Sequence, residues 1–298
     1  MNQTLLLATD FLSSDTLGAS AQLGALLLFA KANTIWRSEG MRTYPFAHLF
    51  VRGAFVLVVL LLIGIFFDKP IGQSGFISMH LQTILLGALG GIGLILFARG
   101  LASLPSKLVF FGGTVQLLVG VLVGHFLLGE KFGINRQLIL LFLLIGQCLL
   151  VYQDRSSWLS LPNNKRIAPF LIGIIWGVYY PIIGVVQSEI GIWQTLIFSE
   201  LGVFLTITIA LIVRLKSELA GLKIKRHYLD MGQQSALSLS AQYLSILCLN
   251  LGGVIFQSIL SSFSNLLYLY VFNKTFKEKI DLRYLLYFGG YGVLVLLL

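Results

Sequence analysis

Ten stretches of mainly apolar residues, each about as long as a bilayer-spanning helix, run through this chain of 298 residues. A helix needs about 20 such residues to cross the hydrocarbon core of a membrane. The stretches are 16–36, 45–67, 81–101, 106–128, 134–152, 167–187, 192–213, 231–250, 254–273 and 282–298. Because the apolar runs are continuous, rather than alternating with polar residues, they predict helices and not barrel strands. We therefore expect an all-α integral membrane protein with ten transmembrane helices.

The composition excludes a soluble domain and a disordered chain. Charged residues make up 11% of the sequence, where soluble domains have about 25%. Hydrophobic residues make up 57%, and disorder requires low hydrophobicity. The two cysteines, Cys148 and Cys248, lie in apolar runs, so we expect neither a disulfide framework nor a metal cluster, and no cofactor. Residues 1–15 lack a basic start and an apolar core, so no cleavable signal peptide is predicted.

An internal repeat is indicated by residues that recur at one offset. Glu130 ends the fourth span within Leu-Gly-Glu-Lys, and Glu278 stands at the same place before the tenth span, 148 residues later. The same offset sets Arg52 in the second span against Glu200 in the seventh, each among aromatic or aliphatic neighbours and a glycine. The five spans before the middle of the chain thus correspond to the five after it.

This repeat predicts the organisation of the chain. We expect a first five-helix repeat at 16–152, a linker at 153–166 and a second five-helix repeat at 167–298. Since each unit has an odd number of spans, the second enters the membrane from the opposite side. Inverted repeats of this kind are typical of secondary transporters, whose binding site lies near the midplane between the halves.

Three motifs within this pattern resemble a known family. They are Phe50-Val51-Arg52-Gly53, the run Ala102-Ser103-Leu104-Pro105-Ser106, and Leu128-Gly129-Glu130-Lys131-Phe132 followed by an apolar span with Gly146. With the span count, they make the chain similar to the EamA-like proteins of the drug/metabolite transporter superfamily. The resemblance implies metabolite transport, often export and including amino-acid export, through a central cavity in a bacterial cytoplasmic membrane. The carboxylate that small relatives carry in the first helix for proton coupling is missing here.

Two ionisable residues lie deep in predicted spans, Arg52 and Glu200. Charges at this depth are costly, so they are candidates for function. In one interpretation they line or gate the cavity: Arg52 binds a substrate carboxylate or phosphate, and Glu200 takes an amine or a proton. In the other they form a structural ion pair that locks the two halves together. The sequence leaves both interpretations open.

Polar side chains form two stripes on the eighth and ninth spans, at helical spacing. The stripes contain Gln234, Ser238, Gln242 and Ser245, then Gln257, Ser261, Ser264 or Asn265, and Tyr268. Such residues often bond neighbouring membrane helices together. Because two stripes occur on adjacent helices, we favour a role in lining the cavity.

Further candidates lie on other spans. Trp176, Tyr179 and Tyr180 precede Pro181, which can kink the sixth span, so these aromatic side chains either stack on a substrate or pack the core. Gln116 is a further candidate for the cavity.

Two other residues are weaker candidates. Lys31 is near a span end, where a lysine can reach the membrane interface. His125 lies close to Glu130, where it has either a proton role or a packing role.

The net charge of +9 follows from the distribution of basic residues. Sixteen of the 21 lie in or near loops after odd-numbered spans, and only Lys69, Lys131 and Arg136 lie on the opposite side. The positive-inside rule then puts both termini outside, whereas the family resemblance puts them inside. The excess of basic residues is therefore explained by the topology of the chain and by contact with anionic lipid, and it does not indicate a nucleic-acid partner.

The function predicted from these features is secondary transport of a small polar organic metabolite by alternating access. No nucleotide-binding motif occurs, so the chain itself would not use ATP. An intramembrane enzyme is disfavoured because aspartate is missing from the mid-span region and only four histidines exist. An accessory membrane subunit is the remaining alternative. We expect a small-molecule partner within a lipid bilayer, and a monomer is compatible with the sequence.

Overall fold

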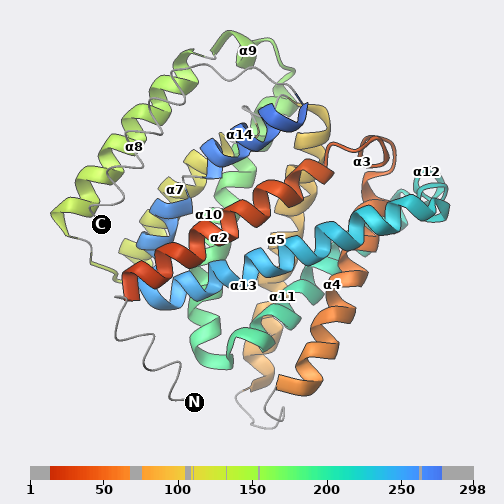
Figure 1. Cartoon of the computed structure of the whole chain (residues 1–298), viewed down its shortest axis with the longest axis horizontal. Helices are drawn as coiled ribbons and strands as arrows, with labels where there is room; N and C mark the ends of the chain where they lie inside the picture. The colour runs from red at the N-terminus through yellow and green to blue at the C-terminus, as the bar shows by residue number, and fades with distance from the viewer. Residues whose placement is uncertain are drawn as a thin grey trace.

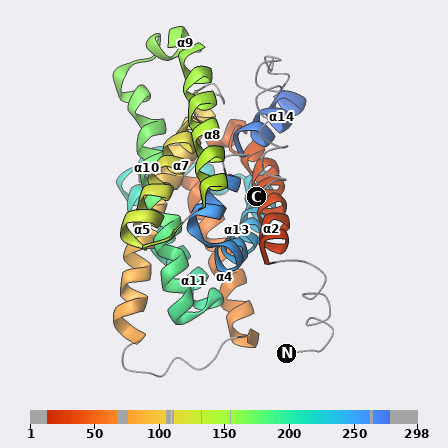
Figure 2. The same cartoon turned by 90° about the vertical axis from the view of Figure 1, so that its left-hand side faces the viewer.

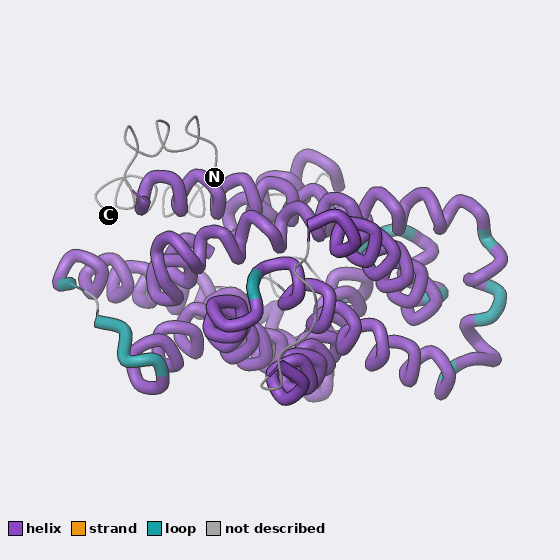
Figure 3. Tube along the Cα trace, turned by 90° about the horizontal axis from the view of Figure 1, so that it is seen from below, coloured by secondary structure: helices purple, strands orange, loops and turns teal. Residues whose placement is uncertain are grey.

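The computed structural model describes residues 14–67, 76–104, 109, 111–131, 133–153, 155–261 and 264–276. Within these ranges the chain is built from helices, and no strand occurs among them. Helices account for nearly all of the described trace in Figure 3, joined by short turns. The fold is therefore all-α.

Nine longer helices occur among the described residues, and all but Ile134–Gln153 pack together in the bundle of Figure 1. The first half of the chain contains α2 (Ser14–Ile35), α4 (Pro45–Phe67), α5 (Phe76–Ser103), α7 (Gly112–Leu122) with a π-helical end η1 (Val123–Leu127), and α8 (Ile134–Gln153). The second half contains α10 (Asn163–Ile190), α11 (Ile192–Val213), α13 (Lys225–Ser261) and α14 (Ser264–Phe276). Short connecting helices are α3 (Glu39–Thr43), α9 (Arg155–Leu159), α12 (Leu215–Glu218) and η2 (Gly221–Lys223).

Within the described part of the chain, five helices are long and apolar enough to cross a membrane. Their apolar parts are Pro45–Gly64, Ser78–Ser103, Lys165–Ile190, Ile192–Val213 and Tyr228–Ser261. Their outward faces carry large apolar side chains such as Leu61, 54% exposed, and Ile209, 64% exposed. An apolar outer surface around a bundle with a polar interior suits lipid rather than water. The prediction of a membrane protein agrees with these helices.

The predicted spans coincide with helices wherever the structure describes them. The stretch 282–298, predicted as the last span, lies outside the described residues. The predicted spans 231–250 and 254–273 correspond to α13 and α14, but α13 extends to Ser261, beyond the predicted boundary between the two spans. In α13 the helical conformation is interrupted at Gly253, which has φ 82° and ψ 176°, and α14 begins at Ser264. The predicted gap between 250 and 254 thus falls on this interruption.

The helices of the two halves are interleaved. The most extensive interfaces join α2 to α13, α5 to α11 and α7 to α10, each pairing one helix of the first half with one of the second. Figures 1 and 2 show α2 lying along α13, although their sequences are about 200 residues apart. The core therefore forms between the halves, which is where a central cavity would lie.

The helices α5 and α11 approach each other closely enough for their backbones to touch. A Cβ atom added to Gly87 would lie 2.0 Å from the carbonyl oxygen of Ser199, and one added to Gly202 would lie 2.0 Å from that of Ile84. Only glycine fits at both positions, because the two backbones are in direct contact. This contact fixes the height of Glu200, one residue from Ser199, against α5.

Candidate binding cavity

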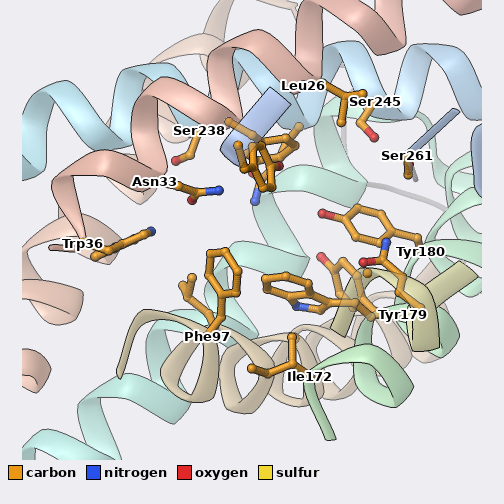
Figure 4. Close-up of a pocket in the computed structure, with 18 of the residues that line it drawn as sticks. Leu26, Asn33, Trp36, Phe97, Ile172, Tyr179, Tyr180, Ser238, Ser245 and Ser261 are labelled. Carbon is orange, nitrogen blue, oxygen red and sulfur yellow. The ribbon is translucent and has the colours of Figure 1, made fainter. Parts of the chain in front are cut away.

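A cavity of about 120 Å³ lies between the helices of the two halves. An engineered cavity of roughly 150 Å³ holds benzene, so this one suits a molecule of about one ring. Its lining comes from α2, α4, α5, α7, α10, α11, α13 and α14. Figure 4 shows serines and Asn33 at one side of the cavity, and Phe97, Ile172 and Tyr179 at the other.

In its lining, Arg52 of α4 and Glu200 of α11 form a bidentate ion pair. Arg52 Nη1 donates to Glu200 Oε2 at 2.5 Å, and Nη2 donates to Oε1 at 3.0 Å. Each residue is 2% exposed. The planar guanidinium matches a carboxylate in this geometry, which makes the contact short and specific. The pair joins the two halves of the chain across 148 residues.

The helix α13 completes the polar surroundings of this pair. Gln242 Nε2 donates to Glu200 Oε1 at 2.8 Å, and Arg52 Nη2 lies 3.5 Å from Ser238 Oγ. Ser235 Oγ donates to the backbone oxygen of Arg52 at 3.1 Å, which binds α13 to α4 at this level. Three helices therefore hold the two charges in place.

The two interpretations of Arg52 and Glu200 are combined in this arrangement. Both residues line the cavity, as one interpretation expects, and they are bonded to each other, as the other expects. Their charges compensate one another, so neither is free to bind a charged ligand while the pair is intact. A role in binding or gating remains a prediction, and it now requires the pair to act as a unit or to open.

Both polar stripes face the cavity. Gln234, Ser238, Gln242, Ser245, Gln257, Ser261 and Tyr268 all line it. Some of them also bond helices together: Gln257 Nε2 donates to Ser245 Oγ at 3.0 Å, and Gln22 Nε2 donates to Ser261 Oγ at 2.8 Å. Cavity lining and helix bonding are thus roles of the same side chains. Asn265 falls on α14, and its side chain lies outside the part of the structure described.

The predicted aromatic residues lie on α10, on the opposite side of the cavity from α13. Trp176, Tyr179 and Tyr180 all line it, and Trp176 lies 4.8 Å from Phe97, ring centroid to ring centroid. The side chain of Trp176 lies against α5 at Gly93, where an added Cβ would meet the indole nitrogen at 2.8 Å. The helix continues through Pro181, so the aromatic residues lie on one uninterrupted element.

Of the remaining candidates, only Gln116 lines the cavity. Lys31 is exposed on α2, on a face turned away from the cavity. His125 is exposed in η1, with its Nδ1 3.0 Å from the backbone oxygen of Glu130. The structure thus brings neither Lys31 nor His125 to the site. Among the described residues no group of three or more His, Cys, Asp or Glu is placed to hold a metal ion.

The sequence analysis missed the contribution of α2. Gln22, Leu26, Phe29 and Asn33 line the cavity, and their spacing of four, three and four residues marks one helical face; Trp36, directly after the end of α2, also lines it. The sequence contains this periodic signal, although Lys31, the one charged residue of the span, lies on another face. Phe97 of α5 is a further lining residue that carried no polar signal.

Outside the cavity, a second carboxylate holds the interrupted part of α13. Glu130 Oε1 accepts a hydrogen bond from the backbone N–H of Val254 at 2.8 Å, and Oε2 accepts one from Ile255 at 2.9 Å. These donors begin the helical segment after Gly253, where backbone N–H groups have no partner within the helix. A carboxylate at this position also interacts favourably with the helix dipole. The repeated motif that contains Glu130 thus has a structural role at the α13 break.

Comparisons with known proteins identify the fold alone. No model of a protein family and no curated protein matches the chain. One solved crystal structure is similar over 94% of this chain and 96% of its own, with a TM-score of 0.67 and 16% sequence identity. That structure is described only as a protein, so the likeness gives a shared architecture and no activity.

Proposed function

We propose that this protein is a secondary transporter that moves a small polar organic metabolite across a cytoplasmic membrane by alternating access. In this proposal it is an EamA-like member of the drug/metabolite transporter superfamily and an exporter, as the sequence resemblance implies. Its ten transmembrane helices form two inverted five-helix repeats, 16–152 and 167–298, joined by 153–166. The cavity around Arg52 and Glu200 is the substrate site.

The pattern of helix contacts supports the two repeats. An offset of 148 residues relates α2 to α10, α4 to α11, α5 to the part of α13 before Gly253, and α7 to the later part with α14. If the halves are equivalent, each interface should have a counterpart made by the corresponding helices. The counterpart of the α2–α13 interface is then α10–α5, that of α5–α11 is α13–α4, and that of α7–α10 is α14–α2. Every one of these six interfaces is present. Two halves that exchange in this way can adopt two equivalent packings, as alternating access requires.

The observation that carries the proposal is the place of the ion pair. Arg52 and Glu200 lie 148 residues apart, the offset that relates the two halves, and they meet in a cavity between them. Burying charges in a membrane bundle is costly, and a structural link between helices can be made from apolar packing instead. A charged contact inside a polar cavity on the interface between repeats is well placed to open when α4 moves relative to α11.

Alternating access can be tested without knowing the substrate. In a variant with Cys148→Ser and Cys248→Ser, a single cysteine is introduced at Gln116→Cys, and the protein is reconstituted in liposomes with one known orientation. A membrane-impermeant maleimide is then supplied on one side or the other. We expect labelling from both sides, because each packing opens the cavity to a different compartment.

A cysteine at Leu205→Cys serves as the matched control, since Leu205 is 45% exposed on α11 and does not line the cavity. It should remain unlabelled from either side. Labelling of Gln116→Cys from one side only would contradict the proposal and indicate a fixed pocket, as in an accessory subunit.

A further inference from the structure

The cavity has two walls of different chemistry. One wall, from α2 and α13, presents amides and hydroxyls, namely Gln22, Asn33, Gln234, Ser238, Gln242 and Ser245. The other, from α5 and α10, presents apolar and aromatic surface, including Phe97, Trp176 and Tyr179. Figure 4 shows this division, with Asn33, Ser238 and Ser245 across the cavity from Phe97 and Tyr179. A ligand that fits must therefore have a polar side and a flat apolar side.

The cavity is electrically balanced without a ligand. Its described lining contains one cation, Arg52, and one anion, Glu200, and these are bonded to each other at two positions. An anionic ligand would compete with Glu200 for the guanidinium, and a cationic ligand would compete with Arg52 for the carboxylate. Either would leave one buried charge without its partner, which is unfavourable at this depth. The balanced pair favours a ligand with no charge.

The amide wall lacks hydrogen-bond donors for its acceptors. The side-chain oxygens of Gln22, Gln234 and Gln242 are buried and have no hydrogen-bond partner among the described residues. For Gln242 the orientation of the amide is fixed, because its nitrogen donates to the Glu200 carboxylate. Buried acceptors left without a donor are costly, so a ligand that supplies O–H or N–H groups here is stabilised.

We propose that the ligand of this cavity contains an uncharged, hydroxylated ring, as in a free monosaccharide or the ribose of a nucleoside. Its hydroxyl groups donate to the amide oxygens of Gln234 and Gln242, and its C–H face packs on Trp176 and Phe97. The cavity volume of about 120 Å³ suits one ring, so the base of a nucleoside would extend toward the open side of the cavity. The inference rests on the proposed function, because it names the substrate class of the same site.

The test measures binding to the purified full-length protein in detergent, by calorimetry and by thermal stabilisation. The uncharged probes are glucose, ribose and adenosine. Glucose is compared with two charged relatives that keep its ring, glucosamine and glucose 6-phosphate, and ribose with ribose 5-phosphate. Phenylalanine represents a zwitterion. We expect at least one uncharged probe to bind at millimolar concentration or tighter, and its charged relatives to bind about tenfold more weakly or not at all.

The result with adenosine separates the two sources of the ring, since tighter binding than ribose identifies a nucleoside site. The proposal is overturned if phenylalanine or a charged probe binds most tightly, or if no uncharged probe binds. Neither result bears on the cysteine-labelling test of alternating access, which uses no ligand, so the two proposals can fail separately.

Two neighbouring glutamines provide matched variants. Gln234→Met removes a buried amide that lines the cavity and does not contact the ion pair, whereas Gln233→Met removes an exposed amide on the same helix. We expect Gln234→Met to weaken binding of the uncharged probe about tenfold, as for the loss of one buried hydrogen bond. Gln233→Met should bind like the wild type. Equal binding by both variants would contradict the assigned contact, with the thermal unfolding profile of each variant reporting whether it is folded.

Discussion

Glu200 and Glu130 satisfy their charges in different ways, although each connects parts of the chain that are more than 100 residues apart. Glu200 is almost fully buried and is balanced by a cation, Arg52. Glu130 is half-buried and accepts hydrogen bonds from two backbone N–H groups at the start of a helical segment. A side-chain partner can move away when helices move, whereas a helix end stays with its helix. The comparison distinguishes a contact able to open from one that holds a segment in place.

The largest effect is expected from separating the cavity pair. Arg52→Met or Glu200→Leu alone should lower the free energy of unfolding by about 4 kcal/mol, because each leaves an uncompensated buried charge. The loss of unfolding free energy in the double variant should be much smaller than the sum of the losses in the two single variants. Unfolding in mixed detergent micelles, arranged as a double-mutant cycle, measures this coupling. Additive losses would show that the two side chains are not energetically linked.

Removing the other carboxylate should have a smaller effect. Glu130→Ala removes two charge-assisted hydrogen bonds to the backbone of α13, and we expect a loss of about 3 kcal/mol in the same assay. Glu130→Gln keeps one acceptor oxygen, so its free energy of unfolding should lie between those of Glu130→Ala and the wild type. Glu189→Ala, which removes an exposed carboxylate on α10, is the control. A loss no larger than that of the control would contradict the capping role.

The backbone at the α13 break provides a second test of Glu130. Gly253 and Gly191 both have positive φ, 82° and 83°, with extended ψ, a conformation essentially confined to glycine. An added Cβ at Gly253 would lie 3.2 Å from Glu130 Oε1, while nothing lies within 4 Å at Gly191. Gly253→Ala should therefore cost about 2 kcal/mol, and Gly191→Ala less. The melting temperatures of the two variants measure this difference. Gly191→Ala has backbone strain alone, whereas Gly253→Ala has the same strain and also displaces the Glu130 carboxylate.

The smallest effect concerns Glu218 of α12, which lies outside the membrane-spanning helices. Its Oε2 accepts a hydrogen bond from the backbone N–H of Ala47 at 3.0 Å, in the first turn of α4. Glu218→Ala should cost about 1 kcal/mol, as for the loss of a helix cap. Glu218→Gln keeps an acceptor oxygen and should cost less, and equal losses for both would contradict the capping role.

Glu218 also gives the fold a predictable response to pH. Burial raises the pKa of its carboxyl group above the usual range, and the N–H groups of Ala47 and Phe46 only partly oppose this shift. The folded protein therefore binds this proton more readily than the unfolded chain does, and the stability gained by protonation is lost as pH rises through the folded pKa. The difference in melting temperature between wild type and Glu218→Gln should shift in favour of the wild type as pH falls through that pKa. A shift in favour of Glu218→Gln would contradict the assigned direction.

Much of the fold could be predicted from the sequence because lipid imposes a simple rule on helix length and polarity. Apolar stretches of about 20 residues located the helices, and the break near Gly253 was expected between 250 and 254. The stripes of Gln234 and Gln257 located one wall of the cavity, since helical spacing fixes which side chains share a face.

Other features of the site depend on contacts that no local pattern encodes. The direct bond between Arg52 and Glu200 requires α4 and α11 to lie at one height, and this is set by the backbone contact at Gly87 and Gly202. The capping of α13 by Glu130 depends on a break in a distant helix. Gln22 and Asn33 do follow helical spacing, but two polar residues in an otherwise apolar span do not by themselves show which face meets a cavity.

The backbone contact between α5 and α11 has a mechanical consequence. Where two helices touch without intervening side chains, no rotamer change is available to let one slide past the other. The two helices must therefore move together, as one rigid unit that includes Glu200. Any rocking of the bundle has to be absorbed at the interfaces filled by flexible side chains, foremost the long contact between α2 and α13. The stiffness of one helix pair thus determines where the rest of the molecule can bend.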